Sequence, residues 1–213
     1  MSQAQSVGAT MQTPNVNPPS RQIVPFRKAT TERTTLLVGD TIAIGAGLVK
    51  NERILEGSGF IYGVMLHATA TAAGNSAAVT FGEDGPHNVF DTIVFGDVNG
   101  DLINVQGWEL FLCNLINRNY AVRYLDASQY IGTTPGAGAT GGSFETWLRV
   151  PIAINRRDLL GIVANQDRAQ KYRLRSDVAA SAVVYGVAPT ALPNVVIERF
   201  YDCLLYTSDA ADE

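Results

Sequence analysis

Cysteine and histidine are scarce in this sequence of 213 residues. It contains two cysteines, Cys113 and Cys203, and two histidines, His67 and His87. Two cysteines cannot build the disulfide framework that stabilises many small secreted domains. Two histidines are too few to complete a multi-histidine metal site. These two scarcities exclude a disulfide scaffold and argue strongly against a histidine-based metalloenzyme.

Long apolar runs and a strong net charge are lacking as well. No uninterrupted apolar run approaches the roughly 18 residues of a membrane span, and the N-terminus lacks the charged-then-apolar pattern of a signal peptide. The formal net charge of −4 comes from 20 acidic and 16 basic residues, which gives no electrostatic footprint for nucleic-acid binding. Hydrophobic residues make up 46% of the chain, enough for a sizeable core in one large all-β domain or two small ones.

The last eleven residues, Cys203–Glu213, differ from the rest of the chain. They resemble the translation of a transposase sequencing adaptor read through in frame, and every residue fits. We therefore expect 203–213 to be a non-native tail and the natural reading frame to be interrupted after about Asp202. Without the three acids of this tail, 17 acidic residues face 16 basic ones, and Cys113 is the single cysteine.

Short runs of β-branched and aromatic residues set the fold class. Each run is closed by Gly, Asn, Asp or Pro, and those of the central stretch are Phe60–Thr71, Ala77–Phe81, Asn88–Phe95 and Asp101–Asn104. Runs of this kind at near-regular spacing are typical of an antiparallel sandwich or barrel. Gly63, inside the first run, indicates a bulge or a close backbone approach.

Further runs before and after this stretch extend the pattern. We predict strands at Thr34–Val38, Thr41–Ile44, Ser143–Pro151, Tyr172–Val178 and Asn194–Tyr201, and a strand or a helical turn at Leu48–Leu55. Asn99-Gly100 predicts a two-residue type I′ hairpin, because both residues tolerate positive φ. Glycine and aspartate at positions 39 and 40 separate the first two strands.

One segment has helical rather than strand periodicity. Val105, Trp108, Leu112 and Leu115 or Ile116 recur at steps of three and four residues, which predicts a short amphipathic helix near 106–117. Its apolar face is widened by Leu110 and Phe111. We expect this helix to plug one end of the sandwich or to cover its edge. Cys113 lies on it among apolar residues, so we expect a small buried thiol rather than a nucleophile, which needs a nearby base.

The N-terminal region divides from the rest by composition. Met1–Ser20 is polar and poor in large apolar residues, which predicts a flexible arm. Residues 21–202 form the predicted folded domain. Four basic residues open it, and they are either solvated flanks of the first strand or contacts to a phosphate-bearing or subunit surface: Arg21, Arg27, Lys28 and Arg33.

Three motifs resemble chemical sites, and each has a simpler explanation. Gly136–Gly141 matches GxGxxG, but it follows Thr-Thr-Pro and precedes a strand, so we predict a flexible loop and no dinucleotide site. Glu83, Asp84 and His87 surround Pro86 and are explained as turn residues. Asp97–Asp101 lacks the spacing and the distal glutamate of a calcium loop, so a hairpin turn is favoured. We predict no catalytic, cofactor-binding or metal-binding residue.

Five segments together resemble a known family: Leu48–Leu55, Phe81–Asn88, Asn99–Asn104, Gly107–Asn114 and Val150–Ile154. Their succession is similar to the first jelly roll of a viral major capsid protein of the double-jelly-roll lineage, and most similar to the tailless phages of the tectivirus and adenovirus type. The resemblance covers about Ile23 to Asp202. It is a pattern of strands and turns and contains no catalytic motif.

The resemblance implies an all-β fold, an antiparallel jelly-roll sandwich of about eight strands with the short helix near 106–117. Proteins of this lineage carry two such rolls, trimerise and tile an icosahedral shell, usually around an internal membrane. It therefore implies a structural protein of the virion, made in the host cytoplasm, with itself, neighbouring capsid proteins, minor capsid proteins or an internal membrane as partners. One roll is missing here, which a truncated frame explains; a complete single-roll protein is the alternative. Tyr120–Gly142 is our candidate contact loop.

Two other functions stay open at this point. A carbohydrate- or receptor-binding module predicts that Trp108 or Trp147 is exposed with polar neighbours, because sugars stack on indoles. Core packing is the competing explanation for both tryptophans. A jelly-roll enzyme needs a convergent, partly buried carboxylate pair, and the histidine count argues against it.

Overall fold

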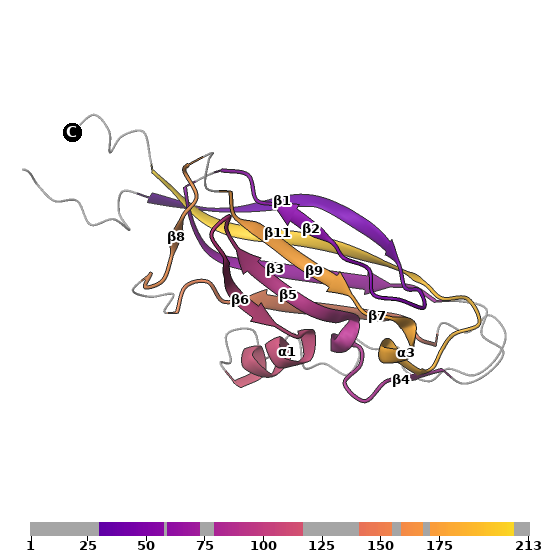
Figure 1. Ribbon diagram of the computed structural model, residues 1–213. Coiled ribbons are helices and arrows are strands. Elements are labelled where there is room, and N and C mark those ends of the chain that lie inside the picture. The colour runs from indigo at the N-terminus through magenta and orange to yellow at the C-terminus, as the bar shows by residue number, and fades with distance from the viewer. Residues whose placement is uncertain are drawn as a thin grey trace, which may run out of the picture.

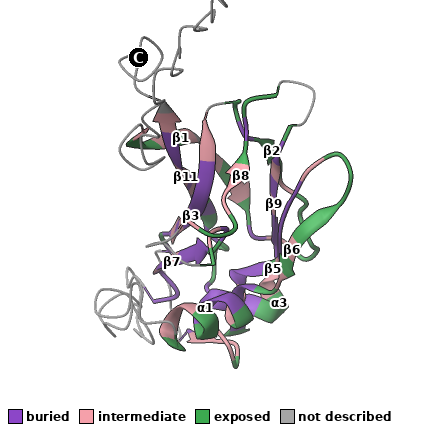
Figure 2. Ribbon diagram, turned by 90° about the vertical axis from the view of Figure 1, so that its left-hand side faces the viewer, coloured by how far each residue is buried: buried purple, intermediate pink, exposed green. Residues whose placement is uncertain are grey.

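The computed structural model describes six stretches of the chain, namely residues 30–57, 59–72, 79–116, 141–154, 159–167 and 171–206. Two antiparallel sheets pack face to face within them (Figures 1 and 2). Sheet A has the order β1 (Thr30–Ala43), β11 (Asn194–Tyr206), β3 (Phe60–Ala70), β7 (Phe144–Val150), and short β8 (Val163–Ala164) pairs with the start of β3. Sheet B has the order β2 (Glu52–Ile54), β9 (Arg173–Val178), β5 (Phe90–Gly96), β6 (Asp101–Val105).

The remaining elements are short. A two-stranded ribbon joins β10 (Tyr185–Val187) to β4 (Thr80–Phe81). Helix α1 (Gly107–Ile116) confirms the predicted helix, and α3 (Ser181–Val184) and a 3₁₀ turn (His87–Val89) are shorter. None of the helices in the described stretches is long and apolar enough to cross a membrane.

The pairing of the two sheets defines the topology. Of the eight strands that form the two four-strand orders, the first pairs with the last (β1 with β11), the second with the seventh (β2 with β9), the third with the sixth (β3 with β7) and the fourth with the fifth (β5 with β6). The chain is thus a long folded hairpin, and the pairing of β11 with β3 rolls it up. This arrangement is a jelly roll, which confirms the predicted fold class.

Alternating side chains of both sheets fill the space between them. In β3, Val64, Leu66 and Ala68 are buried, and they face Ile93 and Phe95 of β5 within one hydrophobic cluster. Figure 2 shows the buried residues concentrated along the inner strands. A period of two in burial is what a strand with one covered face requires.

The strands predicted at Thr34–Val38 and Thr41–Ile44 are confirmed as strand, but they belong to one continuous strand, β1, so the predicted break between them was wrong. Leu37 pairs with Arg199 and Asp40 with Ile197, so two residues of β1 oppose one residue of β11. This bulge bends the strand without ending it. It also changes which residues face inward: Asp40 points toward the second sheet, whereas in a regular strand Gly39 would take that place.

Gly63 confirms the expected bulge. Asp202 pairs with Gly63 and Cys203 with Ile61, so a register shift occurs beside the glycine. The guanidinium of Arg149 crosses the strand here, and a Cβ built on Gly63 would lie 2.5 Å from its Nη2. A side chain at position 63 would therefore displace the Arg149 guanidinium.

The hairpin between β5 and β6 is confirmed, but its predicted turn type was wrong. Gly96 pairs with Asp101, which leaves a four-residue loop, and neither Asn99 nor Gly100 has positive φ. The Asp97 carboxylate accepts hydrogen bonds from the backbone N–H of Asn99 (2.8 Å) and of Gly100 (3.1 Å). This side-chain turn satisfies the backbone without a left-handed conformation.

Strand β11 continues four residues beyond the expected boundary at Asp202. Residues 203–206 pair with Thr30–Arg33, and the buried Cys203 thiol lies 3.4 Å from the Arg33 carbonyl oxygen. The foreign origin of 203–213 stays a prediction, and 207–213 lie outside the described residues. So do the arm 1–20, Arg21, Arg27 and Lys28.

Candidate functional site

Helix α1 covers one lateral edge of the sandwich, where it contacts β7 of sheet A and β5 of sheet B. Leu110 and Phe111 are buried there. The His87 imidazole stacks on Phe111 with ring centroids 3.7 Å apart, and its Nδ1 lies 2.8 Å from the Thr146 hydroxyl oxygen. Burial lowers the pKa of His87 to about 4, so the ring is a neutral packing element. We call this side the helix-covered edge.

The buried face of α1 includes most of the predicted apolar face, because Leu110 and Phe111 are buried and Trp108 and Leu115 pack against the core. Gly107, Leu110 and Phe111 point inward, whereas Leu112 is exposed and Ile116 is 77% exposed. Gly107 lies directly against the backbone of His87 and Phe90, a contact that only a residue without a side chain allows. This contact orients the helix. Cys113 is therefore exposed, and the expectation of a buried thiol was wrong.

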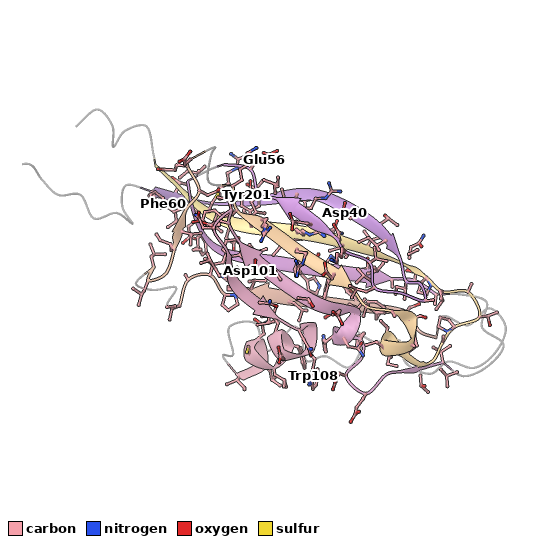
Figure 3. The ribbon with its side chains drawn as sticks, in the orientation of Figure 1. Asp40, Glu56, Phe60, Asp101, Trp108 and Tyr201 are labelled. Carbon is pink, nitrogen blue, oxygen red and sulfur yellow. The ribbon has the colours of Figure 1, made fainter. Side chains whose placement is uncertain are left out.

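Charged residues close the opposite lateral edge, between β1 and β2. Arg199 of β11 has no exposed surface, and its two terminal nitrogens donate to Asp40 Oδ2 (2.6 Å) and to Ser176 Oγ of sheet B (2.8 Å). Arg53 and Asn51 donate to the same Asp40 carboxylate from the sheet B side. We call this side the charge-closed edge; Figure 3 shows Asp40 on it and Trp108 on the helix-covered edge.

The electrostatics of the charge-closed edge are those of a structural cluster. The hydrogen bond from Arg53, with those from Asn51 and Arg199, holds the pKa of Asp40 well below its usual range. Burial lowers the pKa of Arg199, and Asp40 opposes that effect. Three side chains donate to this carboxylate, and most of their hydrogen bonds converge on Oδ2, so Asp40 is held as an ionised structural partner. Sequence reasoning missed this cluster, although an arginine among alternating apolar residues, Val195, Ile197 and Tyr201, signals a buried partner.

The outer face of sheet A has its own polar cluster around His67 of β3. His67 Nδ1 lies 2.8 Å from Glu198 Oε2 of β11, and Nε2 lies 2.9 Å from Glu145 Oε1 of β7. The indole of Trp147 stacks on the imidazole with centroids 3.8 Å apart and donates its N–H to Glu145 Oε1 (2.9 Å). The cluster joins three adjacent strands, and no local spacing in the sequence connects these residues.

Both tryptophans are half-buried, so the criterion for a sugar-binding module is met only in part. His67 covers one face of the Trp147 indole, and the ring centroid of Phe200 lies 6.0 Å from the indole centroid. Trp108 lies beside His87 and Phe111. Sugar stacking needs an open indole face with free polar groups beside it. The polar group nearest Trp147 is already bonded to it.

The outer face of sheet B is charged and paired within itself. Arg173 lies 3.0 Å from Asp101 and 3.9 Å from Glu52, and all three side chains are more than one third exposed. Exposed pairs of this kind contribute little to stability. They make this face hydrophilic, in contrast to the aromatic outer face of sheet A.

The predicted turn at Glu83–His87 is present, and it leads into the 3₁₀ turn. Glu83 is exposed and His87 is buried, so the two side chains do not converge. Within the described stretches no group of three or more His, Cys, Asp or Glu residues is arranged to hold a metal ion. The GxGxxG stretch before Gly141 and the candidate contact loop up to residue 140 lie outside the described residues.

Large apolar side chains remain exposed at edges and turns. Those above half exposure are Leu36, Ile54, Val98, Leu102, Ile116, Ile154 and Leu160. Ile154 and Leu160 come together where the Ile154 N–H donates to the Leu160 carbonyl (2.8 Å). Single apolar side chains are common on folded surfaces, whereas neighbouring ones mark contacts with other chains. Ile154 and Leu160 are therefore a candidate contact point for another chain.

Comparison with solved structures identifies relatives of this fold. The major capsid protein of Sulfolobus turreted icosahedral virus matches with a TM-score of 0.59 and 14% identity over 84% of this chain and 50% of that chain. A chain in the atomic structure of the same virus matches with a TM-score of 0.52 and 17% identity, over 80% of this chain and 45% of that chain. The PBCV-1 virus capsid matches with a TM-score of 0.61 and 11% identity over 89% and 46%.

These matches establish the fold as that of viral capsid jelly rolls, as the sequence resemblance implied. The chain spans about half the length of the solved capsid chains that it matches. No protein-family model matches the sequence, and no curated protein matches it significantly.

Proposed function

We propose that this chain is a structural protein, a subunit of a viral major capsid protein that trimerises and tiles an icosahedral shell. The observation that carries the proposal is the complete first-with-last pairing of eight strands, in a fold that viral capsid chains match over 80–89% of this chain. Such a subunit works through surfaces that repeat from copy to copy and needs no reactive group.

The polar clusters support this proposal. The side chains that an enzyme would use are bonded to one another: Asp40 to Arg53 and Arg199, and His67 to Glu145 and Glu198. These bonded side chains hold neighbouring strands of the roll together. Large apolar side chains remain exposed at its edges and turns. A rigid block with apolar margins suits assembly, because contacts between rigid partners cost little ordering entropy.

The proposal also includes a second domain, the partners and the location of the protein. Because the solved chains are about twice as long, we include a second jelly roll in the full-length protein. Its partners are further copies of itself and neighbouring or minor capsid proteins, with an internal membrane in some shells. Its place is the virion of a tailless, phage-like virus, after synthesis in the host cytoplasm.

The test is the oligomeric state of the purified chain. Size-exclusion chromatography with light scattering, run over a hundredfold concentration range, should show a trimer that persists on dilution. Ile154→Glu and Leu160→Glu place charges at exposed apolar sites and should weaken the trimer. Asn104→Glu, at an exposed polar position on β6 of sheet B, is the control and should leave it intact. A chain that stays monomeric throughout, and that binds immobilised glycans, would replace this proposal with the receptor-binding module.

A further inference from the structure

The loop between β5 and β6 contains the single Asn-Gly step of the sequence, Asn99-Gly100. Both residues are exposed, so water reaches the asparagine side chain. Asparagine is a chemically labile residue, because the backbone nitrogen of the next residue can attack its side-chain amide. Glycine in that next position has no side chain to hinder the attack. The loop therefore contains the chemical groups for a spontaneous modification, the deamidation of Asn99.

The reaction uses only the two residues and water. The Gly100 nitrogen loses its proton to a base in solvent and attacks the Asn99 side-chain carbonyl carbon, Cγ. A new C–N bond forms, and the Cγ–Nδ2 bond breaks to release ammonia. Water then opens the cyclic imide at one of its two carbonyl groups, which leaves aspartate or isoaspartate at position 99. No oxidant, reductant or cofactor enters the balance.

The Asp97 carboxylate binds both reacting groups. Its Oδ1 accepts hydrogen bonds from the backbone N–H of Gly100 (3.1 Å) and of Asn99 (2.8 Å), and its Oδ2 accepts one from Asn99 Nδ2 (3.2 Å). The cyclic imide has no N–H at the Gly100 nitrogen, and Nδ2 has left as ammonia. Two of the three hydrogen bonds must therefore be lost before the imide can form, which opposes the reaction.

The negative charge of Asp97 opposes the reaction as well. The attacking Gly100 nitrogen becomes anionic beside the carboxylate, and a nearby like charge disfavours a charged form. Hydrogen bonds, chiefly from the Asn99 backbone N–H, lower the pKa of Asp97. A carboxylate with a lowered pKa is a weak base, so Asp97 is poorly suited to remove the amide proton itself.

We propose that Asn99 is a deamidation site that Asp97 suppresses in the folded chain. While the loop keeps its hydrogen bonds, the nucleophile and the leaving group both stay bound to Asp97. After the reaction, residue 99 carries a carboxylate, which faces Asp97 as a like charge and has no N–H to donate from its side chain. The modified loop therefore cannot regain its original hydrogen bonds. This inference does not depend on the proposed function.

Peptide mass spectrometry of the full chain, incubated at one mildly alkaline pH, measures the conversion of the Asn99 amide to an acid. In Asp97→Ala the rate should rise at least about tenfold, the effect of one hydrogen bond to a charged group. Circular dichroism checks that this variant stays folded. Asp91→Ala removes an exposed carboxylate of β5 outside the loop and should leave the rate unchanged. An equal or slower rate in folded Asp97→Ala would overturn the proposal.

Two further variants separate charge from reaction route. Asp97→Asn keeps an acceptor oxygen without the charge, so its rate should lie between those of wild type and Asp97→Ala. Adding Gly100→Ala to Asp97→Ala should slow the reaction again, and the loop has space for this methyl group, because a Cβ at position 100 has no neighbour within 4 Å. An undiminished rate in the double variant would contradict attack by the Gly100 nitrogen.

The unfolded chain supplies a test that does not require a folded variant. In concentrated urea the loop and its hydrogen bonds are absent, so wild-type Asn99 should deamidate at least about tenfold faster than in the folded chain. Wild type and Asp97→Ala should then react at nearly the same rate. A wild-type rate that is equal in urea and in the folded chain would show that the loop gives no protection and would overturn the proposal.

Discussion

The two lateral edges of the sandwich solve the same problem with opposite chemistry. Both must close the gap between sheets A and B. The helix-covered edge does so with Leu110, Phe111 and a neutral His87, whereas the charge-closed edge does so with Asp40 and the fully buried Arg199. Apolar burial is non-directional and graded, but a buried ion pair needs each of its partners. The edges should therefore fail in different ways.

The largest expected effect is at the charge-closed edge. Asp40→Ala leaves Arg199 buried without its counter-charge, so it should lower the free energy of unfolding by about 3–5 kcal/mol. Urea titration measures this loss. Arg53 also bonds to Asp40 but is half exposed, so Arg53→Ala is the control and should cost about 1 kcal/mol or less.

A double variant separates charge from packing at the same edge. Asp40→Leu with Arg199→Met removes both charges, and it should recover most of the stability that Asp40→Ala loses. Equal losses in the single and double variants would show that shape rather than charge pairing closes this edge.

At the helix-covered edge the loss should follow the volume removed. Phe111→Ala deletes a buried ring and should cost about 3 kcal/mol in urea unfolding, and Phe111→Leu distinctly less. Leu112 is the next residue along α1 and is exposed, so Leu112→Ala should change stability by at most about 0.5 kcal/mol. Similar losses of stability at both positions would mean that α1 packs against the sheets with a different face.

Lowering the pH should also distinguish the two edges. The pKa of His87 is lowered from 6.5 to about 4 in the folded chain, so its contribution is fully present above 6.5 and is lost as the pH falls toward 4. The loss amounts to about 3 kcal/mol, and His87→Phe should abolish it. The charge-closed edge should respond at lower pH, because the contribution of Asp40 is lost only as the pH falls below the ordinary carboxyl pKa toward its own depressed pKa. An acid response that survives in His87→Phe would contradict this assignment.

The last prediction, with the smallest effect on the fold, concerns the rates at which the two cysteine thiols are modified. Cys113 is exposed on α1 and Cys203 is buried in β11. A maleimide should modify Cys113 in the native chain within minutes and Cys203 only in denaturant, as mass spectrometry of peptides would show. Rapid native modification of Cys203 would mean that the end of β11 is not held between β1 and β3.

Local patterns in the sequence predicted most elements of this fold. The run Phe60–Thr71, the alternation at Ser143–Pro151 and the helix near 106–117 all correspond to observed elements, because each depends on neighbours within a few residues. Gly63 was informative for the same reason. The jelly-roll pairing itself came from the resemblance, since strand order depends on contacts far apart in the sequence.

What the sequence could not predict depends on tertiary contacts. The bulge in β1 is stabilised by the partners of Asp40 on β2 and β11, so an isolated view of positions 39 and 40 indicated a break. The face of α1 is set by the contact of Gly107 with a distant turn. The His67 cluster assembles residues from three strands, and no local spacing connects them.

The most direct test of the whole account is a cryo-electron microscopy map of the particles that the full chain forms. The account predicts jelly rolls related by threefold symmetry, each with its two lateral edges closed by its own α1 and its own Asp40–Arg199 pair, and with exposed apolar residues such as Ile154 at the contacts between copies. Isolated monomers, or a chain in which β1 pairs with a strand other than β11, would contradict it.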